Sequence, residues 1–200
     1  MAVTSPANVT FDQLSMARSL VIFTTLDGPL RDVRSSGAGP ARNAIAVLAD
    51  QGIPLVLVSR DAAEDVFAVQ HELGLRHPFI CDGGTAAYVP HGYFTELNGL
   101  TEPCGDWDVI PFQHGRGTAQ AVRLLIALYR SYFDDAVVVG LGDRWDDREL
   151  LSEVDVPIVV RSEAADQRQL MLKLPSAYVT RASGPAGWSE AILGSVAEEP

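Results

Sequence analysis

The sequence predicts an α/β fold, a three-layer Rossmann-like parallel sheet with helices on both faces. Short apolar runs rich in valine, isoleucine and leucine alternate along the chain with stretches of helical periodicity. Several of these runs end abruptly in Asp, Ser or Gly, which is typical of buried parallel strands that open onto a loop. Ligands bind beyond the carboxyl ends of the strands in such sheets, so a functional site is expected there.

The predicted elements follow one another without internal repeats or low-complexity segments. We predict strands where consecutive residues are mostly apolar and β-branched, and helices where apolar residues recur every three or four positions. In chain order the predicted elements are a strand at 20–25, a helix at 41–51, a strand at 54–58, a helix ending at Leu73, strands at 78–81 and 86–89, a helix at 118–132, a strand at 136–141, a helix through Leu150 and Leu151, a strand at 157–160, a helix at 167–174, a strand at 177–180 and a final helix from Trp188.

The length of 200 residues suits a single domain. Residues 19–197 are expected to form that domain, and residues 1–18 to be a short N-terminal extension. Residues 95–110 are polar and weakly patterned, so they are predicted to be a loop or the remnant of an insertion.

Composition limits the classes of partner. The net charge of −11 and the sequence pI of about 4.6 argue against nucleic acid and anionic membranes as partners. They leave a phosphorylated small molecule possible, because the local charge of a site can oppose the global charge. No apolar run has the length of a membrane span. The two cysteines lack metal-ligand spacing, so a reduced, cytoplasmic protein is expected.

Polar residues of a matching kind stand at the ends of three predicted strands. These residues are Asp27 after the first strand, Ser59 after the second, and Asp143 and Asp147 after the fourth. Such residues are also common turn formers and helix caps. Parallel strands would nevertheless bring them to one edge of the sheet, where carboxylates can hold Mg²⁺ and a hydroxyl can hold phosphate oxygens.

Four stretches resemble a known family. The run LVIFTTLDGPL at 20–30 resembles the first motif of the haloacid dehalogenase superfamily of phosphatases. The run VGLGDRWDD at 139–147, continuing through 154–160, is similar to the fourth motif of the mannosyl-3-phosphoglycerate phosphatase family (type IIB). Residues 78–84 and 184–192 resemble further segments of that family. The resemblance implies a Mg²⁺-dependent phosphomonoester hydrolase acting on a sugar phosphate or a phosphoglycerate-like substrate.

The resemblance also implies a role for each matching residue. Asp27 would be the general acid/base, with a backbone carbonyl that reaches the metal. Asp143 and Asp147 would complete the metal site. Ser59, the backbone at Gly28 and the basic Arg116, which stands where the family has a lysine, would bind the phosphoryl group.

Several positions depart from the family pattern. Thr25 stands where the family has its nucleophilic aspartate, which also ligates Mg²⁺, and Pro29 replaces a threonine. Arg144 and Asp146 replace a serine and an asparagine in the fourth motif. The family inserts a sizeable cap domain between its second and third motifs, and here that cap is expected to be truncated to a small hairpin or loop within about 85–112.

Three functional hypotheses remain at this point. The first is a phosphatase of weak or altered activity, in which Thr25 or a metal-bound water attacks the phosphorus. The second is a non-catalytic pseudophosphatase that binds a phosphorylated ligand or a protein partner. The third is a degenerate domain without a ligand. Apolar surface left by a missing cap could also form a homodimer interface.

Overall fold

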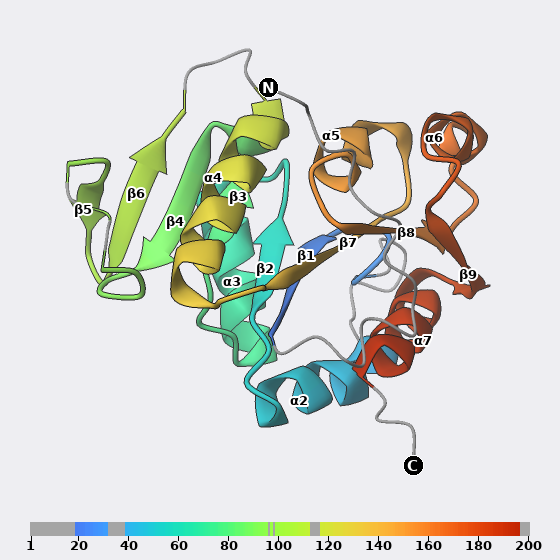
Figure 1. Cartoon of the computed structure of the whole chain (residues 1–200), viewed down its shortest axis with the longest axis horizontal. Helices are drawn as coiled ribbons and strands as arrows, with labels where there is room; N and C mark the ends of the chain where they lie inside the picture. The colour runs from blue at the N-terminus through green and yellow to red at the C-terminus, as the bar shows by residue number, and fades with distance from the viewer. Residues whose placement is uncertain (1–18, 32–38, 96, 98, 113–116, 197–200) are drawn as a thin grey trace.

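The chain folds around one mixed sheet (Figure 1). The computed structural model describes residues 19–31, 39–95, 97, 99–112 and 117–196. In this part of the chain the strands lie in the order β5-β6-β4-β3-β2-β1-β7-β8-β9. Their bounds are Leu20–Thr25 for β1, Leu55–Val58 for β2, Phe79–Cys81 for β3, Ala86–Pro90 for β4, Glu102–Cys104 for β5, Trp107–Pro111 for β6, Val137–Gly142 for β7, Val156–Arg161 for β8 and Tyr178–Ser183 for β9.

Six neighbouring strands, β3-β2-β1-β7-β8-β9, pair in parallel, and β1 lies near their centre. Ile22 of β1 lies opposite Leu55 on one side and Val139 on the other. The first four residues of β1 are apolar and buried because helices cover both faces of the sheet. The predicted fold class is confirmed.

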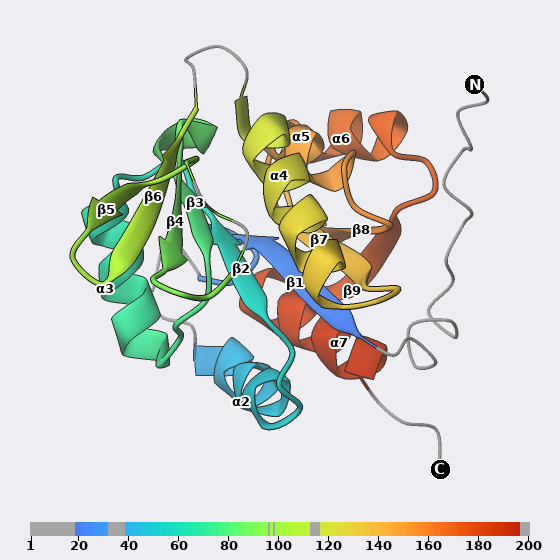
Figure 2. The same ribbon diagram turned by 60° about the vertical axis from the view of Figure 1, so that its left-hand side comes forward.

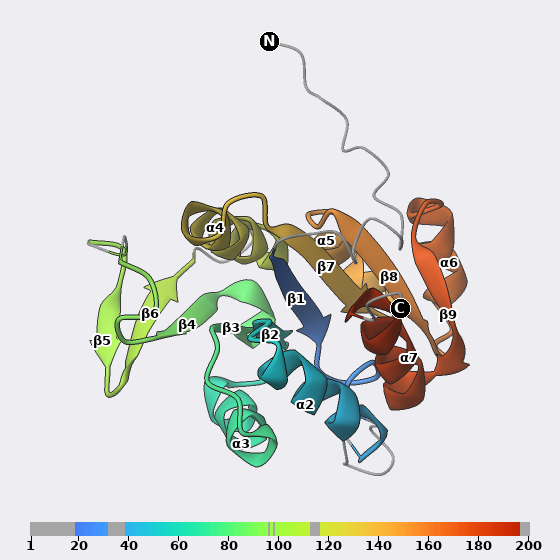
Figure 3. The same ribbon diagram turned by 60° about the horizontal axis from the view of Figure 1, so that its bottom comes forward.

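The helices form the two outer layers (Figure 3). Alternating residues of β1 face opposite layers, so Ile22 belongs to one apolar cluster and Phe23 to the other. The first cluster includes residues of α2, α3 and α7, and the second includes residues of α4 and α5. The helices are α2 at Arg42–Asp50, α3 at Ala63–Leu73, α4 at Gly117–Tyr132, α5 at Arg148–Leu151, α6 at Gln167–Lys173 and α7 at Gly184–Val196, with short 3₁₀ turns η1 at Gly39–Ala41, η2 at Asp82–Gly84 and η3 at Trp145–Asp147.

Residues 95–110 are predicted to be a loop or the remnant of an insertion, and the loop alternative is wrong for 102–104 and 107–110, which are strands. Strand β6 pairs antiparallel with β4, and β5 pairs antiparallel with β6, so the segment extends the edge of the sheet (Figure 2). All three residues of β5 are exposed, and only Ile110 is buried in β6. Edge strands that face water on one side carry a weak hydrophobic pattern, which is why the sequence did not indicate them. The final helix also begins earlier than predicted, at Gly184.

A chain of three side chains joins this edge to the second layer. Tyr129 of α4 donates a hydrogen bond to the hydroxyl of Tyr93 (3.2 Å), which lies 2.9 Å from Nδ1 of His77. The hydroxyl of Tyr93 accepts from Tyr129 and keeps its own proton to donate to Nδ1 of His77 when that nitrogen is unprotonated. Burial lowers the pKa of His77 below its ordinary value of 6.5.

No helix in the described ranges is long and apolar enough to cross a membrane.

The burial of His77 predicts a pH dependence of stability. Because the pKa of His77 is lower in the folded state than in the unfolded state, the neutral ring stabilises the fold above about pH 6.5. That contribution is lost as the pH falls below this value towards the folded-state pKa. We expect wild type to lose more free energy of unfolding between pH 7.5 and 5.5 than His77→Asn, which keeps an acceptor but does not titrate. Equal losses in urea titrations of both proteins would contradict the assignment.

Candidate functional site

A small cavity opens where β1, β2 and β7 end. Its volume is about 90 Å³. The structure brings four of the predicted site residues to its wall: Thr25, Asp27, Ser59 and Asp147. Asp143 and Gly28 line a neighbouring hollow of about 680 Å³, and both hollows share Arg60, Arg144 and Asp146. Arg116 lies outside the described residues.

Thr25 is placed by the strand that carries it. As the last residue of β1 it points into the site, where its hydroxyl donates to Oδ2 of Asp147 at 3.3 Å. The preceding residue, Thr24, faces the opposite layer and accepts a hydrogen bond from Nε1 of Trp188 at 3.0 Å. The hydroxyl of Thr24 in turn donates to the carbonyl of Thr25 at 3.0 Å. A buried tryptophan of α7 therefore supports the end of β1 from behind.

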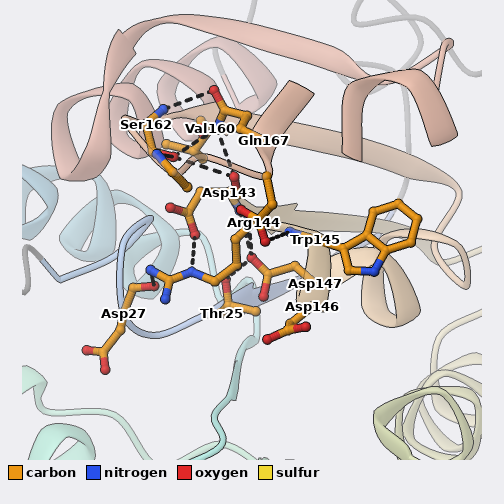
Figure 4. A network of polar contacts seen from close by, with 12 residues as sticks. Thr25, Asp27, Asp143, Arg144, Trp145, Asp146, Asp147, Val160, Ser162 and Gln167 are labelled. Atoms are coloured by element: carbon orange, nitrogen blue, oxygen red, sulfur yellow. Dashed lines mark hydrogen bonds and ion pairs between the residues drawn. The ribbon is translucent and has the colours of Figure 1, made fainter. Parts of the chain in front are cut away.

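The carboxylate of Asp27 is paired within its own loop. Arg31 donates to its Oδ1 from Nε at 2.9 Å and from Nη2 at 2.7 Å. The loop is closed by hydrogen bonds from Gly28 N to Arg31 O and from Arg31 N to Leu26 O, both 2.9 Å. In Figure 4 the side chain of Asp27 points away from Asp143 and Asp147. A general acid/base role would thus require Asp27 to leave its pairing with Arg31.

Asp147 is held by the backbone of its own turn. Its Oδ2 accepts hydrogen bonds from the N–H groups of Asp143 (2.7 Å) and Arg144 (3.2 Å), besides the one from Thr25. Burial raises the pKa of Asp147 to about 6, and the backbone hydrogen bonds only partly oppose this rise. The carboxylate closes the β7 loop and also faces the cavity.

Asp143 lies deeper, with only 3% of its side chain exposed. It approaches the β1 loop closely, because a Cβ atom on Gly28 would lie 2.7 Å from both of its carboxylate oxygens. Gly28 also has a φ of +104°, a conformation that side chains other than hydrogen disfavour. Glycine at this position is therefore required by the contact with Asp143 and by the turn.

Arg144 places a positive charge between these two loops. Its Nε donates to Oδ1 of Asp143 at 3.3 Å, and its Nη2 donates to the backbone carbonyl of Asp27 at 3.4 Å. Burial lowers the pKa of Arg144, but the nearby carboxylates outweigh burial and the net pKa lies above the ordinary value. Figure 4 shows the guanidinium lying between the β1 loop and Asp143.

The oxygen atoms that could ligate a metal in this site do not fit a divalent cation. Thr25 supplies a hydroxyl that is already bonded to Asp147, and Asp143 and the carbonyl of Asp27 both accept from Arg144. Across the described ranges, no three His, Cys, Asp or Glu side chains are arranged to hold a metal ion. Mg²⁺ prefers several oxygen ligands around an open position, and here a guanidinium lies against two of those oxygens.

Ser59 is buried at the end of β2. Its hydroxyl donates to Oδ2 of Asp61 at 3.0 Å and accepts from the N–H of Asp61 at 3.1 Å. The next residue, Arg60, forms an ion pair with Asp146 that spans the gap between the β2 and β7 loops. Thr118, in the first turn of α4, completes the wall of the cavity.

Sequence reasoning did not assign Arg60, Thr118 or Arg144 to the site. Arg144 was visible as a departure from the fourth motif, which was the available signal. The indole of Trp145 points away from the site (Figure 4), and the guanidinium of Arg148 lies 4.9 Å from its centre.

Gln167 of α6 supports the β7 loop from behind. Its Nε2 donates to the carbonyls of Asp143 and Val160, both at 2.9 Å, and its Oε1 accepts from Ser162 N at 3.2 Å. We expect Gln167→Met to lower the free energy of unfolding by about 1–3 kcal/mol, because buried backbone groups lose their partner. The same change at the exposed Gln169 is the control, and urea titrations that show equal losses for both variants would contradict the prediction.

Comparison of sequences shows relatives among phosphatases. No family model matches the chain. A glucosyl-3-phosphoglycerate/mannosyl-3-phosphoglycerate phosphatase of Methanococcoides burtonii is 23% identical over 263 residues, covering 86% of this chain and 96% of the relative. The alignment is longer than the chain, so the relative contains residues with no counterpart here. A phosphatase of the same name from Persephonella marina is 38% identical over 74 residues, which cover 37% of this chain and 28% of that protein.

Comparison of structures shows the same fold in known hydrolases. A haloacid dehalogenase-like hydrolase of Bacteroides thetaiotaomicron superposes with a TM-score of 0.60 at 13% identity, covering 88% of this chain and 98% of the other. The cobalt-bound deoxy-D-mannose-octulosonate 8-phosphate phosphatase of Haemophilus influenzae superposes with a TM-score of 0.54 at 14% identity, covering 88% of each chain. The chain is thus similar in sequence to glucosyl-3-phosphoglycerate/mannosyl-3-phosphoglycerate phosphatases and shares its fold with haloacid dehalogenase-like hydrolases.

Proposed function

We propose that this chain binds a phosphomonoester of a sugar or glycerate type in the cavity between β1, β2 and β7, and hydrolyses it weakly. The observation that carries the proposal is the convergence of Thr25, Ser59, Thr118 and Arg144 on one small cavity. These side chains can donate hydrogen bonds to phosphate oxygens. The relatives are named phosphatases of glucosyl-3-phosphoglycerate and mannosyl-3-phosphoglycerate, which suggests the class of ligand.

The sizes of the two hollows suggest how such a ligand lies. A volume of about 90 Å³ suits a phosphoryl group but is small for a whole ligand, since ligand pockets usually measure roughly 300–1,000 Å³. The neighbouring hollow of about 680 Å³ shares Arg60, Arg144 and Asp146 with it. The phosphoryl group would occupy the cavity and the sugar or glycerate would extend into the hollow.

The chemistry at Thr25 makes fast turnover unfavourable. A carboxylate nucleophile is anionic at neutral pH, whereas a threonine hydroxyl is neutral and needs a base. A loss of about 4 kcal/mol in transition-state stabilisation corresponds to roughly a thousandfold slower reaction. The weak hydrolysis would not depend on Mg²⁺, because the oxygen atoms of the site do not fit this ion as ligands.

The hydrogen bond from Thr25 to Asp147 favours residual hydrolysis over a purely binding role. The oxygen of Thr25 would form a bond to phosphorus as the bond from phosphorus to the ester oxygen breaks. The hydroxyl proton would pass to Asp147 and from there to the departing alcohol, and water would then cleave the phosphothreonine to release phosphate. A hydroxyl bonded to a carboxylate is the arrangement of a nucleophile with its base. Residual activity that is unchanged in Thr25→Val would exclude this route.

Ligand-induced thermal shifts test the binding proposal. Phosphorylated glycerates and sugars should raise the melting temperature of wild type, and Ser59→Ala should lose the shift because a hydroxyl of the cavity wall is removed. Ser152→Ala, an exposed serine outside both hollows, should keep it. The absence of a shift with every phosphorylated ligand, or an equal shift in Ser59→Ala, would overturn the proposal.

A further inference from the structure

The position of the Arg144 guanidinium relative to two separate loops requires explanation. It contacts a side-chain oxygen of Asp143, after β7, and a main-chain oxygen of Asp27, after β1. Both acceptors lie at the carboxyl edge of the central strands, where the sheet brings β1 and β7 side by side. The guanidinium therefore links, by hydrogen bonds, two loops that are far apart in the sequence.

The surroundings of Asp143 create a need for positive charge. Its side chain is almost fully buried, and a second buried carboxylate, Asp147, follows four residues later. An unpaired buried carboxylate costs several kcal/mol, so two neighbouring carboxylates demand a nearby cation. Arg144 supplies one whose charge is retained at any physiological pH.

We propose that the guanidinium of Arg144 is the resident cation of this site and stands in the place that a divalent ion would occupy. It neutralises Asp143, joins the β1 loop to the β7 loop and makes bound metal unnecessary for the architecture of the site. The inference concerns the same cavity as the proposed function, but it does not depend on a ligand being bound there.

This arrangement also affects recognition. Arg144 lines both hollows, so the residue that pairs with Asp143 also borders the space for a ligand. A guanidinium is planar and donates several hydrogen bonds in a fixed geometry that matches phosphate oxygens. Phosphate monoesters should therefore bind without added divalent cations, and a chelator should leave their binding unchanged.

Direct binding of Mn²⁺, a spectroscopic substitute for Mg²⁺, tests the inference. Electron paramagnetic resonance titrations of the whole chain, without phosphorylated ligand, should show no saturable binding in wild type at millimolar Mn²⁺. Arg144→Ser removes the guanidinium and should bind Mn²⁺ at least tenfold more tightly. The melting temperature of Arg144→Ser, but not that of wild type, should rise with Mn²⁺.

A matched control separates position from charge. Arg148→Ser removes the same charge four residues further on, at the start of α5, but Arg148 lies near Asp146 (3.9 Å) and Glu149 (3.7 Å) rather than Asp143. It should bind Mn²⁺ as poorly as wild type. Arg144→Lys keeps the positive charge and serves as the variant to compare if Arg144→Ser fails to fold. It should also remain without bound Mn²⁺.

Three outcomes would overturn the inference. They are saturable Mn²⁺ binding by wild type as tight as that of Arg144→Ser, folded Arg144→Ser that binds no Mn²⁺, and an equal gain of binding in Arg148→Ser. Because no phosphorylated ligand is present, none of these outcomes bears on phosphomonoester binding. Conversely, the absence of ligand-induced shifts would leave the role of Arg144 intact.

Discussion

Replacing Trp188 by alanine is expected to lower the free energy of unfolding by about 3–5 kcal/mol. Its side chain is completely buried between α7 and the sheet, in the same cluster as Ile22. Truncation removes a large apolar group and leaves a cavity in a close-packed layer. It also removes the hydrogen bond to the hydroxyl of Thr24, a second fully buried group. Urea-induced unfolding followed by circular dichroism measures the loss.

Two variants make this prediction specific. Trp145→Ala removes the same side chain from a partly exposed position and should cost about 1 kcal/mol or less. Trp188→Phe keeps most of the apolar volume and should lose less than Trp188→Ala. Thr24 bonds the carbonyl of Thr25, so Trp188→Ala should also weaken ligand binding at the end of β1. A loss in Trp188→Ala no larger than that in Trp145→Ala would contradict the packing described here.

In a buffer containing Mg²⁺, Thr25→Asp alone should change the rate of phosphomonoester hydrolysis less than tenfold. Thr25→Asp combined with Arg144→Ser should raise that rate at least a hundredfold. A new carboxylate at position 25 lies near Arg144, and pairing with the guanidinium would make it a poor nucleophile. Removing the guanidinium frees that carboxylate together with Asp143. A hundredfold gain corresponds to about 2.7 kcal/mol of transition-state stabilisation. Hydrolysis of p-nitrophenyl phosphate measures it.

The control for this experiment is Thr25→Asn with Arg144→Ser, which has the same shape at position 25 without the charge. It should remain as slow as wild type. If Thr25→Asp alone were as active as the double variant, the guanidinium would not limit the site. If the double variant remained inactive while folded, the site would lack more than a nucleophile and an open cation position.

The central architecture could be predicted from local patterns. The apolar run at 20–25 appears as β1, and Ser59 and Asp147 reach the same cavity because parallel strands end at one edge. The edge strands β5 and β6 could not be predicted, since few of their side chains are buried and they are placed by pairing, β6 with β4 and β5 with β6. The proposed dimer and the shortened cap within about 85–112 stay predictions.

The sequence alone determined the fold class and the polar residues at the strand ends, because strand periodicity and strand-end residues are local signals. The phosphatase resemblance came from its motifs. Only the tertiary structure decided how those residues are used. Asp27 pairs with Arg31, Thr25 donates to Asp147, and Arg144 lies between the β1 loop and Asp143. These contacts depend on the distance and direction between side chains from separate strands, and no motif specifies them. The motif marked Arg144 as a departure, but its contacts across the sheet edge show what the departure does.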